Sequence, residues 1–296
     1  MFSTFQKIVL IVGVIFTLLA VWVLSINSTT QATLQSTKKE QVKKITFNTT
    51  ESLQKYFTET NYNWPIESLK HIPEETLTTL PNDINSITDA KSRKILFIQI
   101  MLPIIQAEKK HIRTVRKTVE DKLNRTGNNA ANHEWFKQLL KEYNVKSTTF
   151  IEQRKNLLNR LDELPTTLIL AQAAIESGWG TSRFAREGNS LFGQWTFSKK
   201  GGITPEKREA GKSHQVQAFD SLQASVRSYI KNLNRNRAYK ELREYRNEMR
   251  QNNKPYDAFK LAEGLHRYSQ KGKKYVDILH TIMRSDEFKV IHNLKA

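Results

Sequence analysis

The stretch TTLILAQAAIESGWG, residues 166–180, is the part of the sequence from which fold and chemistry can first be argued. Pro165 interrupts the helical pattern before it, so we expect a new helix that starts at Thr166 or Thr167 and stops at Gly178. Glu176 lies in the last turn of this otherwise neutral helix, where the partial negative charge of the helix end disfavours a carboxylate. Desolvation is expected as well, because its neighbours in sequence are Ala173, Ala174, Ile175 and Trp179. Both effects raise a carboxyl pKa, as a general acid requires, although a surface glutamate that happens to end a helix is the simpler alternative.

The longer segment AQAAIESGWGTSRFAREGNSLFGQW, residues 171–195, resembles the signature segment of the glucosaminidase superfamily, glycoside hydrolase family 73, and is similar to its Bax-type members. The resemblance extends over roughly residues 90 to 285 and is strongest over 165–195. It implies that Glu176 is the catalytic acid. It also implies that the element after the helix shapes the cleft, through Gly188, Asn189, Leu191, Phe192 and Gly193.

Two further catalytic residues are implied by the same resemblance. A hairpin glutamate would be the partner of the acid, and the segment 201–219 offers Glu209, which we favour, or Glu206. The usual Glu-Tyr-x-x-Gly pattern of the family is absent there, and both residues could instead be solvated charges. The stretch GLHRYSQKGKKYVDIL places Tyr268 where the family has an active-site tyrosine, and Tyr275 is expected only to pack.

Candidate substrate-binding residues surround the signature. Trp179, Phe192 and Trp195 could line the cleft, because aromatic faces suit sugar rings, or could belong to the core. Gln172 lies one turn before Glu176 on the same helix face, where it could hydrogen-bond the acid or the substrate. Asn189 is included because of its place in the cleft-shaping element.

The N-terminal run IVLIVGVIFTLLAVWVLSI, residues 8–26, contains no charge. At about 1.5 Å per residue it would span roughly 28 Å, close to the thickness of a bilayer core. Lys7 precedes the run and the next lysines are Lys38 and Lys39, which places the N-terminus inside and the rest of the chain on the periplasmic side of the inner membrane. We favour an uncleaved single-pass anchor over a cleaved signal peptide.

Four parts are expected along the chain: an anchor (1–26), a polar stalk (27–54), a helical segment (55–150) and the catalytic domain (151–296). Order should begin near Tyr56, and a helix should run from Pro73 to Leu123, kinked or ended by Pro103. The stretches LFGQWTF and HQVQAF alternate like the two strands of a hairpin with a long tip. The expected fold is therefore mainly α, with a lysozyme-like helical domain, a β-hairpin beside the cleft, and an N-terminal transmembrane helix followed by a helical segment.

Composition limits the possible functions. The chain has no cysteine, so disulfides and thiolate chemistry are excluded, and HEWFK at 133–137 is not a paired-histidine zinc motif. No metal or organic cofactor is implied. The net charge of +18 favours a polyanionic environment, but a nucleic-acid binder would leave the signature helix unexplained, so no nucleic acid is expected.

The resemblance implies an endo-β-N-acetylglucosaminidase that acts on the glycan strands of peptidoglycan. A lytic transglycosylase and a non-catalytic wall-binding or scaffold protein remain as alternatives.

Overall fold

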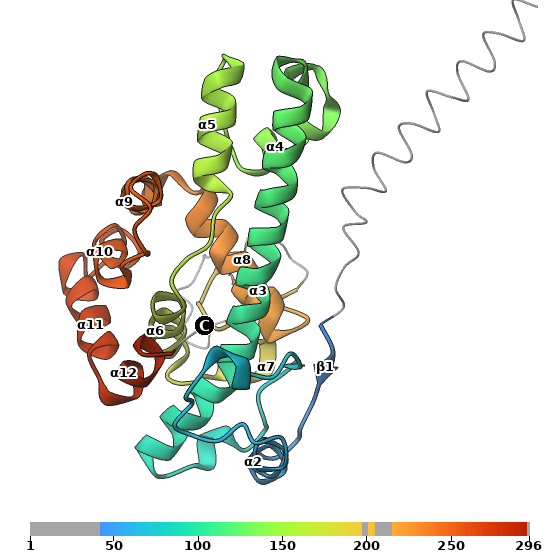
Figure 1. Ribbon diagram of the computed structural model, residues 1–296. Coiled ribbons are helices and arrows are strands. Elements are labelled where there is room, and N and C mark those ends of the chain that lie inside the picture. Colours follow the sequence, from blue (N-terminus) through green and yellow to red (C-terminus); the bar gives the residue numbers. More distant parts are fainter. Residues whose placement is uncertain (1–41, 197–200, 205–214, 295–296) are drawn as a thin grey trace, which may run out of the picture.

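A computed structural model describes residues 42–196, 201–204 and 215–294 (Figure 1). Most of these residues are helical, and the only strands among them form two small sheets. The mainly α architecture predicted from the sequence is therefore confirmed, and it is consistent with a lysozyme-like domain. The expected membrane segment, residues 8–26, lies outside the described residues. Within the described ranges, no helix combines the length and apolar character needed to cross a bilayer.

The signature helix α6 (Thr166–Ser177) lies in the centre of the main core. It begins after Pro165 and ends at Gly178, as predicted. Its residues from Thr167 to Ala174 are all buried, which is typical of a helix covered on every side. It packs against the helices α3 (Ala90–Thr126), α10 (Ala258–Glu263), α11 (Lys273–Met283) and α12 (Asp286–His292).

Helix α3 is the longest helix of the described chain and runs through both hydrophobic clusters (Figure 1). We predicted that Pro103 would either kink or end this helix; it lies within the helix and does not end it. Proline has no N–H for the carbonyl four residues earlier, which here belongs to Gln99. The Tyr62 hydroxyl donates to that carbonyl at 3.2 Å, and the Gln99 amide donates back to the Tyr62 carbonyl at 2.8 Å. A side chain from another segment thus replaces the missing helical bond.

The helix predicted to begin at Pro73 was placed wrongly. Residues 73–89 contain the strand β2 (Thr76–Leu77) and the 3-10 turn η2 (Ile84–Ser86), and α3 begins only at Ala90. The Asp89 side chain accepts a bond from the Ser92 amide at 2.6 Å and caps the helix there. Strand β2 pairs in parallel with β1 (Lys44–Ile45), a long-range contact that overrides the local helix signal.

Folded structure also begins earlier than Tyr56. Within the range expected as a stalk, the structure has β1 and the start of α2 (Thr50–Glu59), whose Leu53 is completely buried. Leu53 and Phe57 belong to the same hydrophobic cluster as α6. Residues 42–54 are therefore part of the folded body, and α3 of the segment 55–150 packs directly on α6 and α8 (Leu222–Arg235).

A second, smaller hydrophobic cluster lies at one end of the molecule, at the top of Figure 1. It joins the last turns of α3 to η3 (Gly127–Asn132), α4 (Glu134–Glu142) and α5 (Phe150–Arg160). The C-terminal half adds α8 (Leu222–Arg235), η4 (Arg237–Tyr239) and α9 (Lys240–Gln251). Helix α8 is tied to α3 by the fully buried Glu108, which accepts two bonds from Arg227 at 2.7 and 2.9 Å.

The expected hairpin is present and has an additional strand. Strand β3 (Trp195–Thr196) pairs with β5 (Gln215–Gln217) in antiparallel fashion, as predicted, and β4 (Gly202–Ile203) pairs with the other edge of β5. The short helix α7 (Arg183–Gly188) connects α6 to this sheet. Glu206 and Glu209 lie outside the described residues.

Candidate active site

Glu176 lies where α6 ends in a tight left-handed turn. Gly178, Trp179 and Gly180 have φ angles of 59°, 59° and 81°, a conformation that is costly for a residue with a side chain. A Cβ on Gly180 would lie 3.0 Å from the Phe97 ring, so the turn also needs a small residue there. The Ser177 hydroxyl accepts a bond from the Gly180 amide at 2.9 Å, which holds the turn against the helix.

A chain of hydrogen bonds leads from the core to the carboxyl group of Glu176. The Tyr229 hydroxyl donates to Gln172 Oε1, and Gln172 Nε2 donates to the Tyr275 hydroxyl oxygen at 2.9 Å. The Tyr275 hydroxyl in turn donates to Glu176 Oε1 at 2.7 Å. These residues come from α8, α6 and α11, so the chain joins three helices around the acid.

This chain assigns the two oxygens of Glu176 different surroundings. A side-chain amide can only donate through Nε2, so the Tyr275 oxygen must accept there and its single proton must go to Glu176 Oε1. With Oε1 accepting this bond, Oε2 is the oxygen available to carry the proton of the neutral acid.

Burial raises the pKa of the Glu176 carboxyl, and the Tyr275 hydrogen bond and the nearby charge of Lys271 oppose the rise. Desolvation is the largest of the three effects, so the raised pKa expected from the sequence is confirmed, with burial as its main cause. A raised pKa keeps the acid protonated further toward neutral pH.

A cluster of tyrosines surrounds the acid, consisting of Tyr229, Tyr239, Tyr268 and Tyr275. The rings of Tyr268 and Tyr275 stack with centroids 5.5 Å apart and planes 10° apart, and the Tyr239 ring lies 5.9 Å from that of Tyr268. Burial raises the pKa of all four phenols, and the charge of Glu176 raises it further. All four therefore stay neutral, and they place no positive charge beside the acid.

The positions of Tyr268 and Tyr275 differ from those expected from the sequence. Tyr275, expected only to pack, is the residue that donates to Glu176. Tyr268, expected in the active site, belongs to the cluster but directs its hydroxyl to the Phe192 carbonyl at 3.3 Å. Gln172 bonds the partner of the acid, not the acid itself, and is completely buried.

The other predicted substrate-binding residues divide between core and surface. Phe192 is 3% exposed and stacks on Tyr229 at 3.9 Å, which favours its core alternative. The Trp179 ring packs edge-on against Phe97 and Phe288 at 6.0 and 6.3 Å. The buried Asn189 ends α7, and its side-chain amide donates to the Phe219 carbonyl at 3.0 Å. Trp195 is 57% exposed on β3, so of these residues its ring is the most accessible to a ligand.

Sequence reasoning missed Tyr229 and Tyr239. Tyr229 could have been found from the sequence, because it lies on the apolar face of SLQASVRSYIKNLN and should be buried. A buried tyrosine needs a hydrogen-bond partner for its hydroxyl. Sequence reasoning also missed the buried acid Glu108, whose carboxylate is fully occupied by Gln223 and Arg227 and is structural. Within the residues that the structure describes, no three His, Asp or Glu side chains gather as metal ligands would.

Comparison with known proteins gives three similarities. The family model Glucosaminidase, described as mannosyl-glycoprotein endo-beta-N-acetylglucosaminidase, matches residues 152–287. Protein bax of Escherichia coli strain K12 is 31% identical over 207 residues, which are 69% of this chain and 74% of that protein. The crystal structure of the catalytic domain of the autolysin Auto from Listeria monocytogenes has a TM-score of 0.32 and 19% identity, covering 60% of this chain and 86% of that one. The range matched by the family model includes Glu176 and all four tyrosines around it.

Proposed function

The chain belongs to the glucosaminidase family as a Bax-type member, and on this basis we propose that it is a peptidoglycan hydrolase with endo-β-N-acetylglucosaminidase activity. It would cleave the β-1,4 bond after N-acetylglucosamine in glycan strands. The observation that carries the proposal is the Glu176 carboxyl at the end of the signature helix, whose pKa is raised by burial and whose Oε1 accepts a bond from Tyr275.

In the proposed reaction, Glu176 Oε2 gives its proton to the glycosidic oxygen that leaves. The carboxylate that results is stabilised by the Tyr275 hydrogen bond, because a bond to a charged acceptor is stronger than one to a neutral acceptor. The interaction thus strengthens as charge develops, as transition-state stabilisation requires. Tyr275 lowers the barrier in this way, while burial outweighs its effect on the resting acid and keeps the carboxyl pKa raised.

The second half of the reaction needs a group on the other side of the sugar. A hairpin glutamate, Glu209 or Glu206, would activate water if the enzyme inverts, and two carboxyl groups about 6.5–9.5 Å apart would fit that route. In the other route the N-acetyl group of the substrate assists, with Tyr268 positioning it. Trp195, exposed on β3, would offer its ring to a sugar.

The proposed location follows from the N-terminal run. Residues 8–26 would anchor the chain as a single pass in the inner membrane, with the folded body on the periplasmic side next to the glycan. The net charge of +18 would keep the protein close to acidic polymer or headgroups.

The test is digestion of purified peptidoglycan by the full chain, by Glu176→Gln and by a control, with mass spectrometry of the fragments. Glu187→Gln is the matched control, because Glu187 is an exposed glutamate on the neighbouring helix α7 whose partner is Arg183. We expect reducing-end N-acetylglucosamine fragments from the wild type and the control only.

The other possible results of this digestion would each contradict part of the proposal. Ends with a 1,6-anhydro ring would identify a lytic transglycosylase. Glycan binding without cleavage by any of the three proteins would support a wall-binding scaffold. Cleavage by Glu176→Gln at the rate of the wild type would remove Glu176 from the role of acid.

A further inference from the structure

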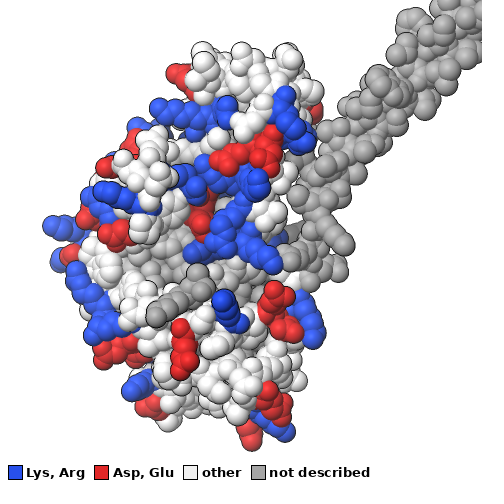
Figure 2. All heavy atoms as spheres, viewed as in Figure 1, with Lys and Arg blue, Asp and Glu red and all other residues white. Residues whose placement is uncertain are grey.

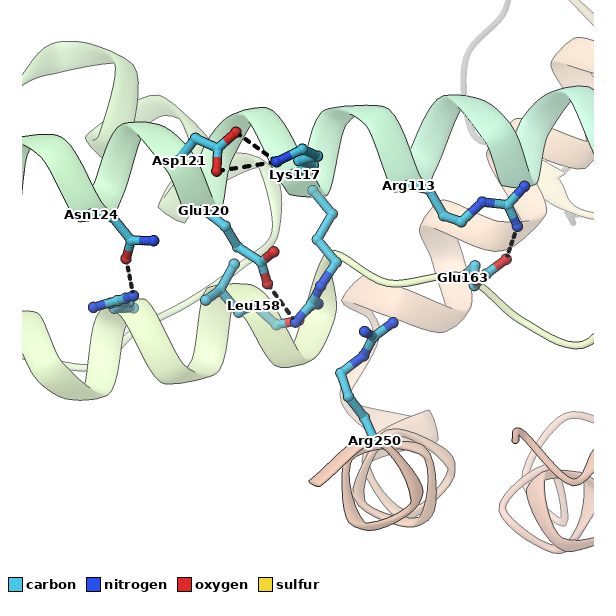
Figure 3. Close-up of a pocket in the computed structure, with 10 residues that line it drawn as sticks. Arg113, Lys117, Glu120, Asp121, Asn124, Leu158, Glu163 and Arg250 are labelled. Atoms are coloured by element: carbon cyan, nitrogen blue, oxygen red, sulfur yellow. Dashed lines mark hydrogen bonds and ion pairs between the residues drawn. The ribbon is translucent and has the colours of Figure 1, made fainter. Parts of the chain in front are cut away.

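Two solvent-filled grooves lie away from the acid, and they differ in how their charges are balanced. The first, between α3, α5 and α9, is shown in Figure 3. Most of its cations have acidic partners within it: Arg113 with Glu163 at 2.7 Å, Lys117 with Asp121 at 3.1 Å, and Arg116 with Glu120 at 2.9 Å. Arg250 is bound by Asp162 at 2.6 Å. Arg154 donates instead to the neutral Asn124 Oδ1, so four of the five cations of this groove have an acidic partner.

The second groove, here called the basic groove, has a volume of about 550 Å³ and lies between the loop after α4, α5, η4 and α9. It contains five cationic side chains and one acidic side chain. The acid is Glu244, which pairs with Lys240 at 3.3 Å. Its lining residues are Asn144, Val145, Lys146, Ser147, Asn156, Asn159, Arg160, Arg237, Lys240, Arg243 and Glu244.

Four cations of the basic groove thus have no acidic partner within it. Two are held in place by main-chain carbonyls near the end of α8: Arg243 donates to the Leu233 and Asn236 carbonyls at 2.7 and 2.8 Å, and Arg160 donates to the Arg235 carbonyl at 2.5 Å. A guanidinium has five N–H groups, so each keeps donors to spare. The other two, Lys146 and Arg237, are exposed.

Of these four cations, Arg160 and Arg243 are close enough to repel each other. Burial lowers the pKa of Arg243 to about 9, and the neighbouring charges of Arg160 and Arg246 lower it further. Arg243 is still protonated at neutral pH, and Glu244, which also pairs with Lys240, is the one acidic side chain lining the groove to offset its five cations. Bringing a multiply charged anion into the groove would relieve this repulsion.

We propose that the basic groove is a binding site for a multiply charged phosphate group, of the diphosphate or phosphate monoester class. Four cations without an acidic partner match a ligand with two or more negative charges better than a single carboxylate. Guanidinium groups bind phosphate oxygens through paired N–H donors. The amides of Asn144, Asn156 and Asn159 add neutral donors.

The groove shares no residue with the acid site, but one element touches both. In the 3-10 turn η4, Tyr239 packs on Tyr268 in the tyrosine cluster, whereas Arg237 lines the basic groove. Ligand binding can therefore be measured without catalysis. A failure of the phosphate site would leave the proposed hydrolase untouched, and the reverse also holds.

The test is calorimetric titration of the full chain in detergent with pyrophosphate, orthophosphate and succinate at matched ionic strength. The variant Lys146→Gln/Arg237→Gln removes two exposed cations of the groove, and Lys117→Gln/Arg154→Gln removes the same charge from the first groove. We expect pyrophosphate to bind more tightly than orthophosphate or succinate. The affinity should fall tenfold or more in the first variant and less than twofold in the second. Unfolding midpoints equal to the wild type would show that both variants fold.

Three results would overturn the proposal: no binding of pyrophosphate by the wild type, equal losses in the two variants, or succinate bound as tightly as pyrophosphate. Two competition arms identify the source of the phosphate. Displacement of pyrophosphate by phosphatidylcholine vesicles that contain phosphatidic acid, but not by vesicles that lack it, would indicate a lipid headgroup. Displacement by a nucleoside diphosphate alone would indicate a soluble ligand.

Discussion

Replacing Tyr275 by phenylalanine should move the pKa of Glu176 upward. The substitution removes the hydroxyl that donates to Glu176 Oε1 at 2.7 Å and stabilises its charged form. A hydrogen bond to a charged group contributes about 1.5–3 kcal/mol. The neutral carboxyl accepts the same bond more weakly, so the charged form loses more when the bond is removed, and the carboxyl pKa rises.

The pH dependence of kcat/KM on soluble glycan fragments measures this shift. A general acid acts only while protonated, so activity falls as the pH rises through its pKa, and a higher pKa moves that fall to higher pH. The variant should therefore keep its activity further into the alkaline range than the wild type. It should also unfold more easily, by about 1–3 kcal/mol, because the buried Gln172 Nε2 loses its acceptor.

Tyr268→Phe is the matched control. Its hydroxyl donates to the Phe192 carbonyl, and its ring stacks on Tyr275, so the variant disturbs the cluster without touching the bond to Glu176. The alkaline limb of the control should coincide with that of the wild type. An alkaline limb in Tyr275→Phe that stays in place or moves to lower pH would refute the reasoning, and so would an equal shift in Tyr268→Phe.

Three further predictions concern stability. Because burial raises the pKa of Glu176 in the folded state, the folded protein binds this proton more tightly than the unfolded chain does. The resulting gain in the free energy of unfolding is fully present below the unfolded pKa of about 4.3 and is lost as the pH rises through the folded pKa. Glu176→Gln should therefore raise the thermal midpoint above that of the wild type at pH 8 but not at pH 4, and equal changes would contradict this. Asp162→Asn leaves the completely buried Arg246 without its counter-charge and should cost about 3–5 kcal/mol in urea unfolding at pH 7; a loss below 1 would show that the carbonyl bonds suffice. Gly264→Ala would place a Cβ 2.4 Å from the Leu242 amide nitrogen, so we expect the free energy of unfolding to fall by about 1–3 kcal/mol. An unchanged urea midpoint would show that α10 can shift away from α9 without loss of stability.

The parts of the site that could be predicted from the sequence depend on local signals. The end of α6 follows from Gly178, which adopts the left-handed conformation that closes many helices. A raised pKa for Glu176 was expected from apolar neighbours within one turn, and burial is its largest cause in the structure. The pairing of β3 with β5 follows from alternation on either side of a polar stretch. In each case the deciding residues are close together in the chain.

The parts that could not be predicted depend on contacts between distant segments. Tyr275 lies 99 residues after Glu176, and Tyr229 lies 57 residues after Gln172. Two tyrosines seven residues apart both fit an active-site role, and only the packing of α11 on α6 determines which hydroxyl reaches the carboxylate. The same holds for Pro103, whose helix continues because Tyr62 arrives from another segment.

The choice of tyrosines around Glu176 has a physical reason. The chain carries a net charge of +18, and on the face shown in Figure 2 lysines and arginines gather over its middle and upper part. Positive charge lowers a carboxyl pKa, as Lys271 does here, and would leave the acid without its proton. The neutral phenol of Tyr275 stabilises the carboxylate once it forms without adding a positive charge beside it. An arginine in place of Tyr275 would bind the carboxylate more strongly, and for that reason would abolish the acid.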